Sequence, residues 1–189
     1  MYGLVNNGIE TFVTENFGAN IWADVCKSAN TPTTAFDQAQ VYDDALTFDL
    51  VAAISDHLGK SQDEVLEVFG SYWVGFARAT PIGALMSFAG SSFLEVLDSL
   101  DDMHQRMMAA MPHLKPPSFE LEHIEGNHYR LHYYSVREGL APMVVGLIHQ
   151  LAATHGEEIS LSQSRSRTDG ADHDTFDMVI KGKNPGVSA

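Results

Sequence analysis

One histidine lies on the apolar face of a predicted amphipathic helix. The capping-box pattern Ser92-Phe93-Leu94-Glu95 predicts where this helix begins, and His104 falls in register with Leu97, Leu100 and Met108. A neutral imidazole that faces a dry core can bind a metal ion, including the iron of a haem. More often such a histidine is a core residue whose nitrogens are satisfied by backbone groups or water, and periodicity alone favours that interpretation.

A second candidate group lies in the segment Tyr133-Tyr134-Ser135-Val136-Arg137. If a strand continues through it, Tyr133, Ser135 and Arg137 project from the same face. A phenol, a hydroxyl and a guanidinium together donate several hydrogen bonds and carry a positive charge, which suits a carboxylate or a phosphate. An exposed strand end with one surface ion pair is the plainer alternative. In a chain with 11 basic residues, however, an arginine beside two hydroxyl donors keeps anion binding open as the second interpretation.

The other combinations of polar residues are weaker. Asp172-His173-Asp174 could form a metal or catalytic cluster, but an acidic loop before a strand is the more common structure. His123, His128 and His132 surround one predicted hairpin, yet neighbouring strand residues alternate faces, so a three-histidine zinc site is not expected. The single cysteine, Cys26, excludes an internal disulfide and is interpreted as a core residue. Phosphate-binding loops, serine nucleophile elbows and HExxH motifs are absent from the sequence.

Composition narrows the classes of partner. The chain has 189 residues, 44% of them hydrophobic, and a formal net charge of −14. An acidic chain lacks the basic footprint that binds nucleic acid or anionic membranes, so neither partner is expected. The N-terminal sequence has no basic region before an apolar run, and no segment approaches the roughly 20 apolar residues of a membrane span. We therefore expect a cytoplasmic protein.

Helical patterns fill the N-terminal half. Apolar residues recur at three- and four-residue spacing up to Val13, and Gly18 follows as a stop signal. A second helix is predicted from Ile21, and a third over about 47–58 with Gly59 at its end. Ser61-Gln62-Asp63-Glu64 is a capping box in front of a fourth, largely buried helix.

The hydrophobic period changes to two after Lys115-Pro116-Pro117. Two strands are predicted over 119–135 with a turn at 125–128, followed by a helix over about 140–155 and two further strands near 159–163 and 175–180. The order, helices first and then strand–strand–helix–strand–strand, predicts an α+β fold.

Several short motifs together resemble one family. They are an MYG start, an FGxYW helix, a helix ending LDxxHxRM, then PPxFE, YxSxREGL and DGxDHxxF, in the order typical of haem nitric oxide/oxygen-binding (H-NOX) proteins. The stretch from Tyr133 to Leu140 is similar to that in the haem domain of animal soluble guanylate cyclase. The resemblance covers nearly the whole chain. It implies one domain over 1–183, with a tail over 184–189. A helical N-terminal subdomain up to about residue 60 would pack on a haem-bearing C-terminal subdomain with helices and an antiparallel sheet of about four strands.

The resemblance also implies roles for single residues around a haem b held between the two subdomains. His104 becomes the proximal iron ligand, and Tyr133, Ser135 and Arg137 become the clamp on the haem propionates. Pro117 matches the position at which a proline packs on the porphyrin.

The distal side of the haem is expected to be apolar. Family members that hold O2 resemble one another in having a distal tyrosine, and its position falls here on Met143 or Pro142, neither of which donates a hydrogen bond. The other distal residues are expected to be Val5, Ile9, Leu147 and Trp73, and the last keeps an N–H that could donate.

The resemblance implies that the chain senses NO and also binds CO, and that it is not an enzyme. The signal is expected to arise when the bond to His104 is released and the subdomains shift. The effector would be a separate histidine kinase, diguanylate cyclase/phosphodiesterase or chemotaxis receptor. An O2-binding haem protein and a haem-free anion-binding module of related fold remain as alternatives.

Overall fold

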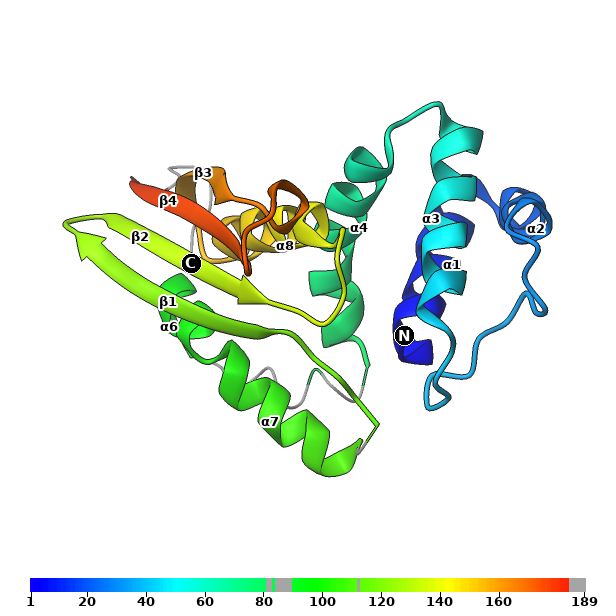
Figure 1. The fold of residues 1–189 in the computed structure, drawn as a ribbon, viewed down its shortest axis with the longest axis horizontal. Helices are drawn as coiled ribbons and strands as arrows, with labels where there is room; N and C mark the ends of the chain where they lie inside the picture. The colour runs from blue at the N-terminus through cyan, green and yellow to red at the C-terminus, as the bar shows by residue number, and fades with distance from the viewer. Residues whose placement is uncertain (81–82, 84–89, 112, 184–189) are drawn as a thin grey trace.

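The computed structural model describes residues 1–80, 83, 90–111 and 113–183. Its elements form two groups, with the N-terminal helices on one side and a sheet with its covering helices on the other (Figure 1). The first group comprises α1 (Gly3–Phe17), α2 (Ala19–Ser28) and α3 (Asp44–Leu58). In the chain, α4 (Gln62–Arg78) leads from this group to the second, which contains α6 (Phe93–Asp98), α7 (Leu100–Ala110), β1 (Ser118–Glu125), β2 (His128–Tyr134), α8 (Ala141–Thr154), β3 (Glu157–Arg165), the 3-10 turn η1 (Arg167–Asp169) and β4 (Asp174–Lys183).

In the N-terminal half, helices begin and end near the capping and stop residues that the sequence predicted. Gly18 and Gly59 both adopt positive φ angles, 93° and 63°, at the ends of α1 and α3. The Ser61 capping box is formed at α4. The third helix starts earlier than predicted, because the side chain of Asp43 accepts a hydrogen bond from the Ala45 N–H and caps the helix there.

The helix that carries His104 differs from the prediction. A single helix was expected from the Ser92 capping box, but the chain forms α6 and α7 with a break at Ser99. Ser99 donates its hydroxyl hydrogen bond back to the Val96 carbonyl at 3.0 Å, and such competition with the helical backbone favours a helix end. Because α7 is separate, His104 is carried by a helix of 11 residues.

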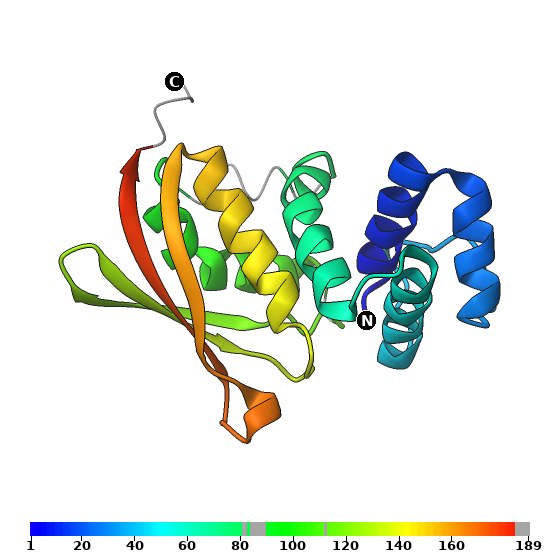
Figure 2. The same cartoon turned by 90° about the horizontal axis from the view of Figure 1, so that it is seen from above.

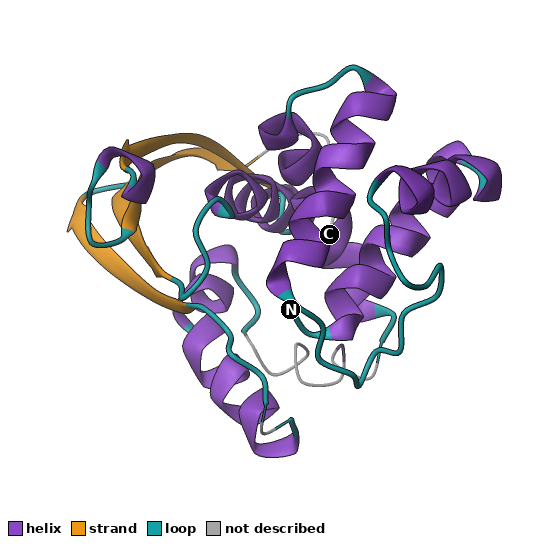
Figure 3. Ribbon diagram, turned by 45° about the vertical axis from the view of Figure 1, so that its right-hand side comes forward, coloured by secondary structure: helices purple, strands orange, loops and turns teal. Residues whose placement is uncertain are grey.

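The four strands form one antiparallel sheet in the order β1-β2-β4-β3. The predicted hairpin is confirmed, with the turn at Gly126 and Asn127. The last two strands are longer than expected, because β3 pairs with β4 along its whole length, from Glu157 to Arg165. Helix α8 lies along one face of the sheet (Figure 2), and the secondary-structure view shows helices gathered on that side (Figure 3). The α+β architecture is as predicted.

The apolar side chains form two main cores. One comprises residues of α1 to α4, including Ile9, Leu50 and Phe69, and the other lies between the sheet, α6 and α8, including Leu131 and Ile148. Helix α4 contributes to both cores, because Phe69 belongs to the first and Val74 to the second. The predicted division at about residue 60 stays a prediction, and the predicted tail over 184–189 lies outside the described residues.

Helices α4 and α8 meet through their backbones. A Cβ atom at Gly70 would lie 2.0 Å from the carbonyl oxygen of Met143, and one at Gly146 would lie 1.8 Å from that of Glu67. The hydroxyl of Ser71 donates to the Gly146 carbonyl at 3.1 Å across the same contact. Any side chain larger than hydrogen at either glycine would therefore force the two helices apart.

None of the described helices combines the length and apolar character needed to cross a membrane.

This contact predicts opposite effects for two glycines of α4. Gly70→Ala should lower the free energy of unfolding by roughly 1–3 kcal/mol, because the new methyl group overlaps the α8 backbone. Gly75→Ala is the matched control on the same helix: nothing lies within 4 Å of its Cβ position, so it should be neutral or stabilise by about 0.5–1 kcal/mol. Urea unfolding of both variants measures the difference, and equal effects would contradict the backbone contact.

Candidate functional site

A cavity of about 570 Å³ lies between the two cores. Its wall is built from α1, α3, α4 and α8, from α7 and the segment that leads to β1, and from the end of β2 and the loop that follows. Every site residue predicted from the sequence lines it: Val5, Ile9, Trp73, His104, Pro117, Tyr133, Ser135, Arg137, Met143 and Leu147. Residues up to 142 positions apart in the chain, Val5 and Leu147, thus face one space.

His104 enters this wall from α7. Its ring stacks on Phe119 of β1 with the centroids 6.0 Å apart, and its Nδ1 atom is buried without a hydrogen-bond partner among the described residues. Burial is the largest influence and lowers the pKa of His104, while the Asp101 carboxylate and the Pro117 carbonyl act in the opposite direction. The imidazole is therefore neutral at pH 7, and a neutral imidazole offers a lone pair to a metal.

Asp101 fixes the helix that carries His104. Its carboxylate accepts hydrogen bonds from the Ser118 hydroxyl at 2.7 Å and from the Phe119 N–H at 2.6 Å, which ties the first turn of α7 to the start of β1. His104 lies one turn further along the same helix. The orientation of the imidazole is consequently set by β1 as well as by its own helix.

The polar group Tyr133, Ser135 and Arg137 meets at the cavity, but not in the way predicted. The strand does not persist through it, since β2 ends at Tyr134, so a shared strand face is wrong. A local turn brings the side chains together instead: the Arg137 N–H donates to the Ser135 hydroxyl oxygen at 3.0 Å. Serine competes for backbone groups in this manner, which also explains why the strand stops.

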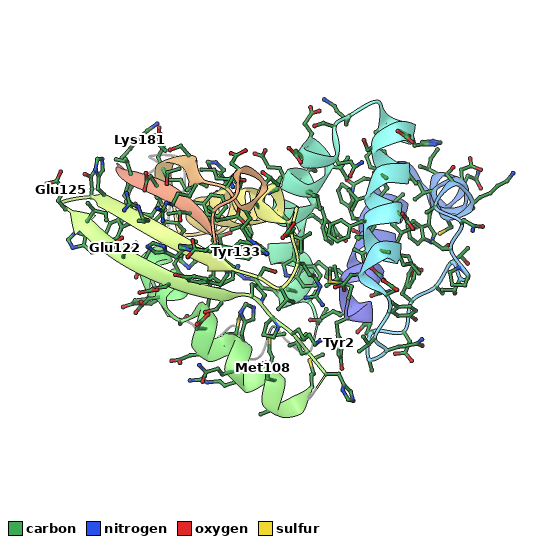
Figure 4. The ribbon with its side chains drawn as sticks, in the orientation of Figure 1. Tyr2, Met108, Glu122, Glu125, Tyr133 and Lys181 are labelled. Atoms are coloured by element: carbon green, nitrogen blue, oxygen red, sulfur yellow. The ribbon has the colours of Figure 1, made fainter. Side chains whose placement is uncertain are left out.

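Tyr133 supplies a buried phenol to this group. Its side chain projects toward the middle of the molecule, whereas the labelled residues Glu122, Glu125 and Lys181 lie at the far end of the sheet (Figure 4). Burial is the largest influence and raises the pKa of Tyr133, against smaller opposing effects from Ser135 and the nearby arginines. The phenol therefore remains protonated at neutral pH and can donate a hydrogen bond.

Arg137 joins three parts of the chain. Its Nε donates to the Asp44 carboxylate of α3 at 3.0 Å, and its Nη1 donates to the Lys115 carbonyl, just before β1, at 2.8 Å. The N-terminal ammonium of Met1 also donates to Asp44. One carboxylate at the cavity wall thus lies between two cations.

These cations shift the ionisation of Asp44. Burial is the largest single influence and opposes ionisation, but the hydrogen bonds and charges of the Met1 ammonium and Arg137 together lower the pKa of Asp44. The contact shows that a carboxylate is a suitable partner for this arginine, and an anion entering the cavity would have to share the guanidinium with Asp44.

The side of the cavity formed by α1, α4 and α8 is apolar. Val5, Ile9, Met143 and Leu147 face it together with Trp73. Of the two residues left open by the sequence, Met143 lines the cavity and Pro142 is not among the described lining residues. The Trp73 indole makes no hydrogen bond to the described part of the chain, whereas Trp22 donates to the Thr34 carbonyl.

A second cavity of about 440 Å³ adjoins the first. It extends between α4, α6 and α8, and its described lining is mainly apolar, including Val74, Val96 and Leu151. The two cavities share five lining residues: Trp73, His104, Met107, Phe119 and Leu147. His104 therefore lines both cavities.

Two histidines away from the cavity contact each other. His173 and His132 are hydrogen-bonded at 2.8 Å, and His173 also contacts the Asp172 carboxylate at 2.8 Å. Within the described part of the chain, no group of three or more His, Cys, Asp or Glu side chains is arranged to hold a metal ion. Cys26 is a buried core residue, as interpreted from the sequence.

Two features of the site were missed by the sequence analysis. Asp44 is 93 residues from Arg137, and no local motif marks it as a partner. Leu4 and Met107 form a small cluster that connects α1 with α7; the spacing of Met107 from His104 predicts a shared helix face but does not indicate the partner on α1.

The Asp44 contact predicts a pH-dependent contribution to stability. Because the pKa of Asp44 is lowered in the folded chain, the contribution is present above the unfolded-state pKa of about 3.9 and is lost as pH falls through the lower folded-state value. The Asp44 side chain is 42% exposed, so solvent screening limits it to about 1 kcal/mol or less. Urea unfolding should show Asp44→Asn less stable than wild type at pH 7, with a smaller gap near pH 3.5.

Asp49→Asn, an exposed site on the same helix, is the control and should change stability little at either pH. A gap between Asp44→Asn and wild type that is the same at both pH values would contradict the ionic origin.

Comparisons with known proteins agree with this geometry. The family model described as Haem-NO-binding matches residues 2–163. "Soluble guanylate cyclase 89Da" of Drosophila melanogaster is 29% identical over 170 residues, which cover 89% of this chain and 26% of the relative, so the chain spans about a quarter of that protein's length.

Two solved structures share the fold. An H-NOX protein from S. oneidensis, solved in the Fe(II)NO ligation state, matches with a TM-score of 0.87 at 18% identity, over 96% of this chain and 100% of that one. The Fe(II) unliganded H-NOX protein from K. algicida matches with a TM-score of 0.82 at 16% identity over 100% of both chains. With the family model covering residues 2–163, the chain belongs to the haem-NO-binding (H-NOX) family.

Proposed function

We propose that this chain is a gas sensor that holds one haem b in the cavity between its two cores and responds to NO and CO. The observation that carries the proposal is His104, a buried neutral imidazole with an unpartnered Nδ1, in the same cavity wall as Tyr133, Ser135 and Arg137. When bound, haem would supply an iron that accepts an imidazole and diatomic gases as ligands, and His104 would provide the imidazole.

The chemistry of the wall fits such a group. A porphyrin needs two apolar faces, a ligand near its centre and donors at its acidic edge. Val5, Ile9 and Leu147 offer apolar contact from one side, and Pro117 and Phe119 from the side of His104. In our proposal Tyr133, Ser135 and Arg137 are the donors at the propionate edge, and Arg137 already holds a carboxylate, that of Asp44, at 3.0 Å.

Selectivity for NO and CO over O2 follows from the lack of a donor at Met143. Bound O2 gains from a hydrogen bond to its outer oxygen, and the thioether of Met143 cannot provide one. Trp73 is the donor that bears on this point, because the residue lines the cavity and its indole N–H makes no hydrogen bond within the described chain. We propose that its N–H does not reach the gas.

The signal in our proposal is the loss of the restraint on His104. Helix α7 is tied to β1 through Asp101 and contacts α1 through Met107 and Leu4. Release of the His104 side chain would let α7 move, and the Leu4–Met107 contact would pass that movement to the N-terminal helices. An effector that distinguishes the two positions would read the signal. We propose a separate effector, such as a histidine kinase, a diguanylate cyclase/phosphodiesterase or a chemotaxis receptor, and no catalysis by this chain.

Replacement of His104 tests the ligand assignment. His104→Gly, reconstituted with haem, should retain much less haem than wild type, because the iron loses its protein bond. Added imidazole should partly restore the Soret absorption by filling the vacated position.

His113→Gly is the matched control, since His113 lines the same cavity and is exposed. It should retain haem like wild type. Full haem retention by His104→Gly without imidazole would contradict the assignment, and loss in His113→Gly alone would transfer it to that residue.

Replacement of Met143 tests the origin of gas selectivity. The reduced, haem-loaded wild type should change its absorption spectrum with NO and with CO but not in air. Met143→Tyr should bind O2 about ten- to a hundredfold more tightly, because a hydrogen bond in a dry pocket contributes on the order of 1–3 kcal/mol.

Met143→Phe keeps the ring without the hydroxyl and should behave like wild type toward O2. A stable spectral change of the wild type in air would contradict the NO-selective proposal, and Trp73→Phe would then show whether the indole is the donor.

A further inference from the structure

One arginine outside the cavity binds the segment between β2 and α8, which carries Ser135 and Arg137 of the proposed propionate clamp. Arg167 of η1 donates from Nη1 to the Ser135 carbonyl at 2.6 Å and from Nη2 to the Glu138 carboxylate at 2.9 Å. The Arg167 side chain is 21% exposed and the Glu138 side chain 68%, so the guanidinium is largely covered while its partner carboxylate is open to solvent. In Figures 1 and 2 the orange segment between β3 and β4 lies beside the yellow segment that leads from β2 to α8.

Arg167 is itself fixed by the Asp172-His173-Asp174 segment, to which the proposed function gives no role. The carboxylate of Asp174 is buried and accepts from the Arg167 backbone N–H at 3.0 Å and from Gln163 Nε2 at 2.9 Å. Asp174 is also the β4 residue that pairs with Tyr133 of β2. The turn that carries Arg167 is therefore anchored directly opposite the phenol of the clamp.

The segment that Arg167 contacts is not held by the hydrogen bonds of a helix or a strand. Strand β2 ends at Tyr134 and α8 begins at Ala141, so residues 135–140 lie outside regular structure. On the cavity side, the Ser135 hydroxyl accepts from the Arg137 N–H. On the outer side, the Ser135 carbonyl and Glu138 are both held by one guanidinium. A bidentate arginine fixes such a segment better than a single hydrogen bond, because both ends are restrained at once.

We propose that Arg167 is a positioning residue for the anion clamp: it holds residues 135–138 so that Ser135 and Arg137 are already in place when the propionates bind. Arg167 is not among the residues that line the cavity, so it acts through this segment and not by contact with the haem. The inference rests on the proposed haem binding. Without Arg167 the loop would have to be ordered on binding, and that entropy would weaken the hold on the carboxylates.

Haem loss to an excess of a haem-scavenging apoglobin tests this role. Arg167→Gln should lose haem b about five- to tenfold faster than wild type. Arg165→Gln is the matched control, because Arg165 is an exposed arginine two positions away whose side chain makes no hydrogen bond or ion pair to the described residues. It should lose haem at the wild-type rate, and Arg137→Ala should lose it faster, as the positive control.

Haem dimethyl ester separates positioning from general stability, because its esterified propionates carry no charge. Arg167→Gln and wild type should lose this ester at equal rates. An unchanged rate of haem b loss in Arg167→Gln, or an equal acceleration with haem b and with the ester, would overturn the inference.

A conservative variant tests the two-point contact itself. Arg167→Lys keeps the charge but cannot present the planar fork. It should lose haem b at nearly the rate of Arg167→Gln, and a wild-type rate would overturn positioning by the guanidinium.

The same experiment separates this inference from the proposed function. Haem uptake by wild type, with faster loss from Arg137→Ala but not from Arg167→Gln, contradicts the role of Arg167 alone. A wild-type chain that takes up no haem contradicts the proposed function, and the inference with it.

Discussion

The close backbone contact of α4 with α8 is the constraint on which the rest of the structure depends. Gly70 and Gly146 leave no room for side chains between the two helices. Each helix also packs into the hydrophobic cores on either side of the cavity. Because the helix axes are held at this distance, Trp73, Met143 and Leu147 are fixed as one wall of the cavity. A small change in the contact between α4 and α8 would therefore alter the shape of the cavity as well as the stability of the fold.

At the opposite edge of the cavity, Arg137 joins separate segments of the chain through charged hydrogen bonds. Its guanidinium connects α3 through Asp44 with the segment before β1 through the Lys115 carbonyl. A charged donor that is shared between Asp44 and a bound carboxylate couples the binding of that carboxylate to the position of α3.

Local sequence signals predicted the helices and strands well, whereas contacts between segments far apart in the chain were harder to predict. The stop at Gly18, the Ser61 capping box and the hairpin before Tyr134 are short-range features, and the structure contains all three. The break at Ser99 was missed, because apolar spacing continues through it and only the competition of its hydroxyl reveals it. Asp44 and Arg167 were missed as partners of the clamp, because their roles arise from the tertiary fold and not from any motif around them.

The strand expected through Ser135 and Arg137 shows how a correct grouping can rest on a wrong geometry. Residue types alone indicated an anion site, and the three side chains do meet at the cavity. A turn at Ser135, and not strand alternation, brings them there, and Arg167 donates a hydrogen bond to the Ser135 carbonyl in the same segment. Periodicity could not reveal this, since a serine that ends a strand and one that continues it occupy the same place in the pattern.

The central claim is that one haem binds in the cavity between the two cores, and tryptophan fluorescence tests it most directly. In a Trp22→Phe variant the remaining tryptophan is Trp73, which lines the cavity. Titration of the haem-free variant with haemin should quench its emission and reach saturation at one haem per chain. Emission that persists after the Soret absorption has saturated, or quenching with no defined endpoint, would contradict the account.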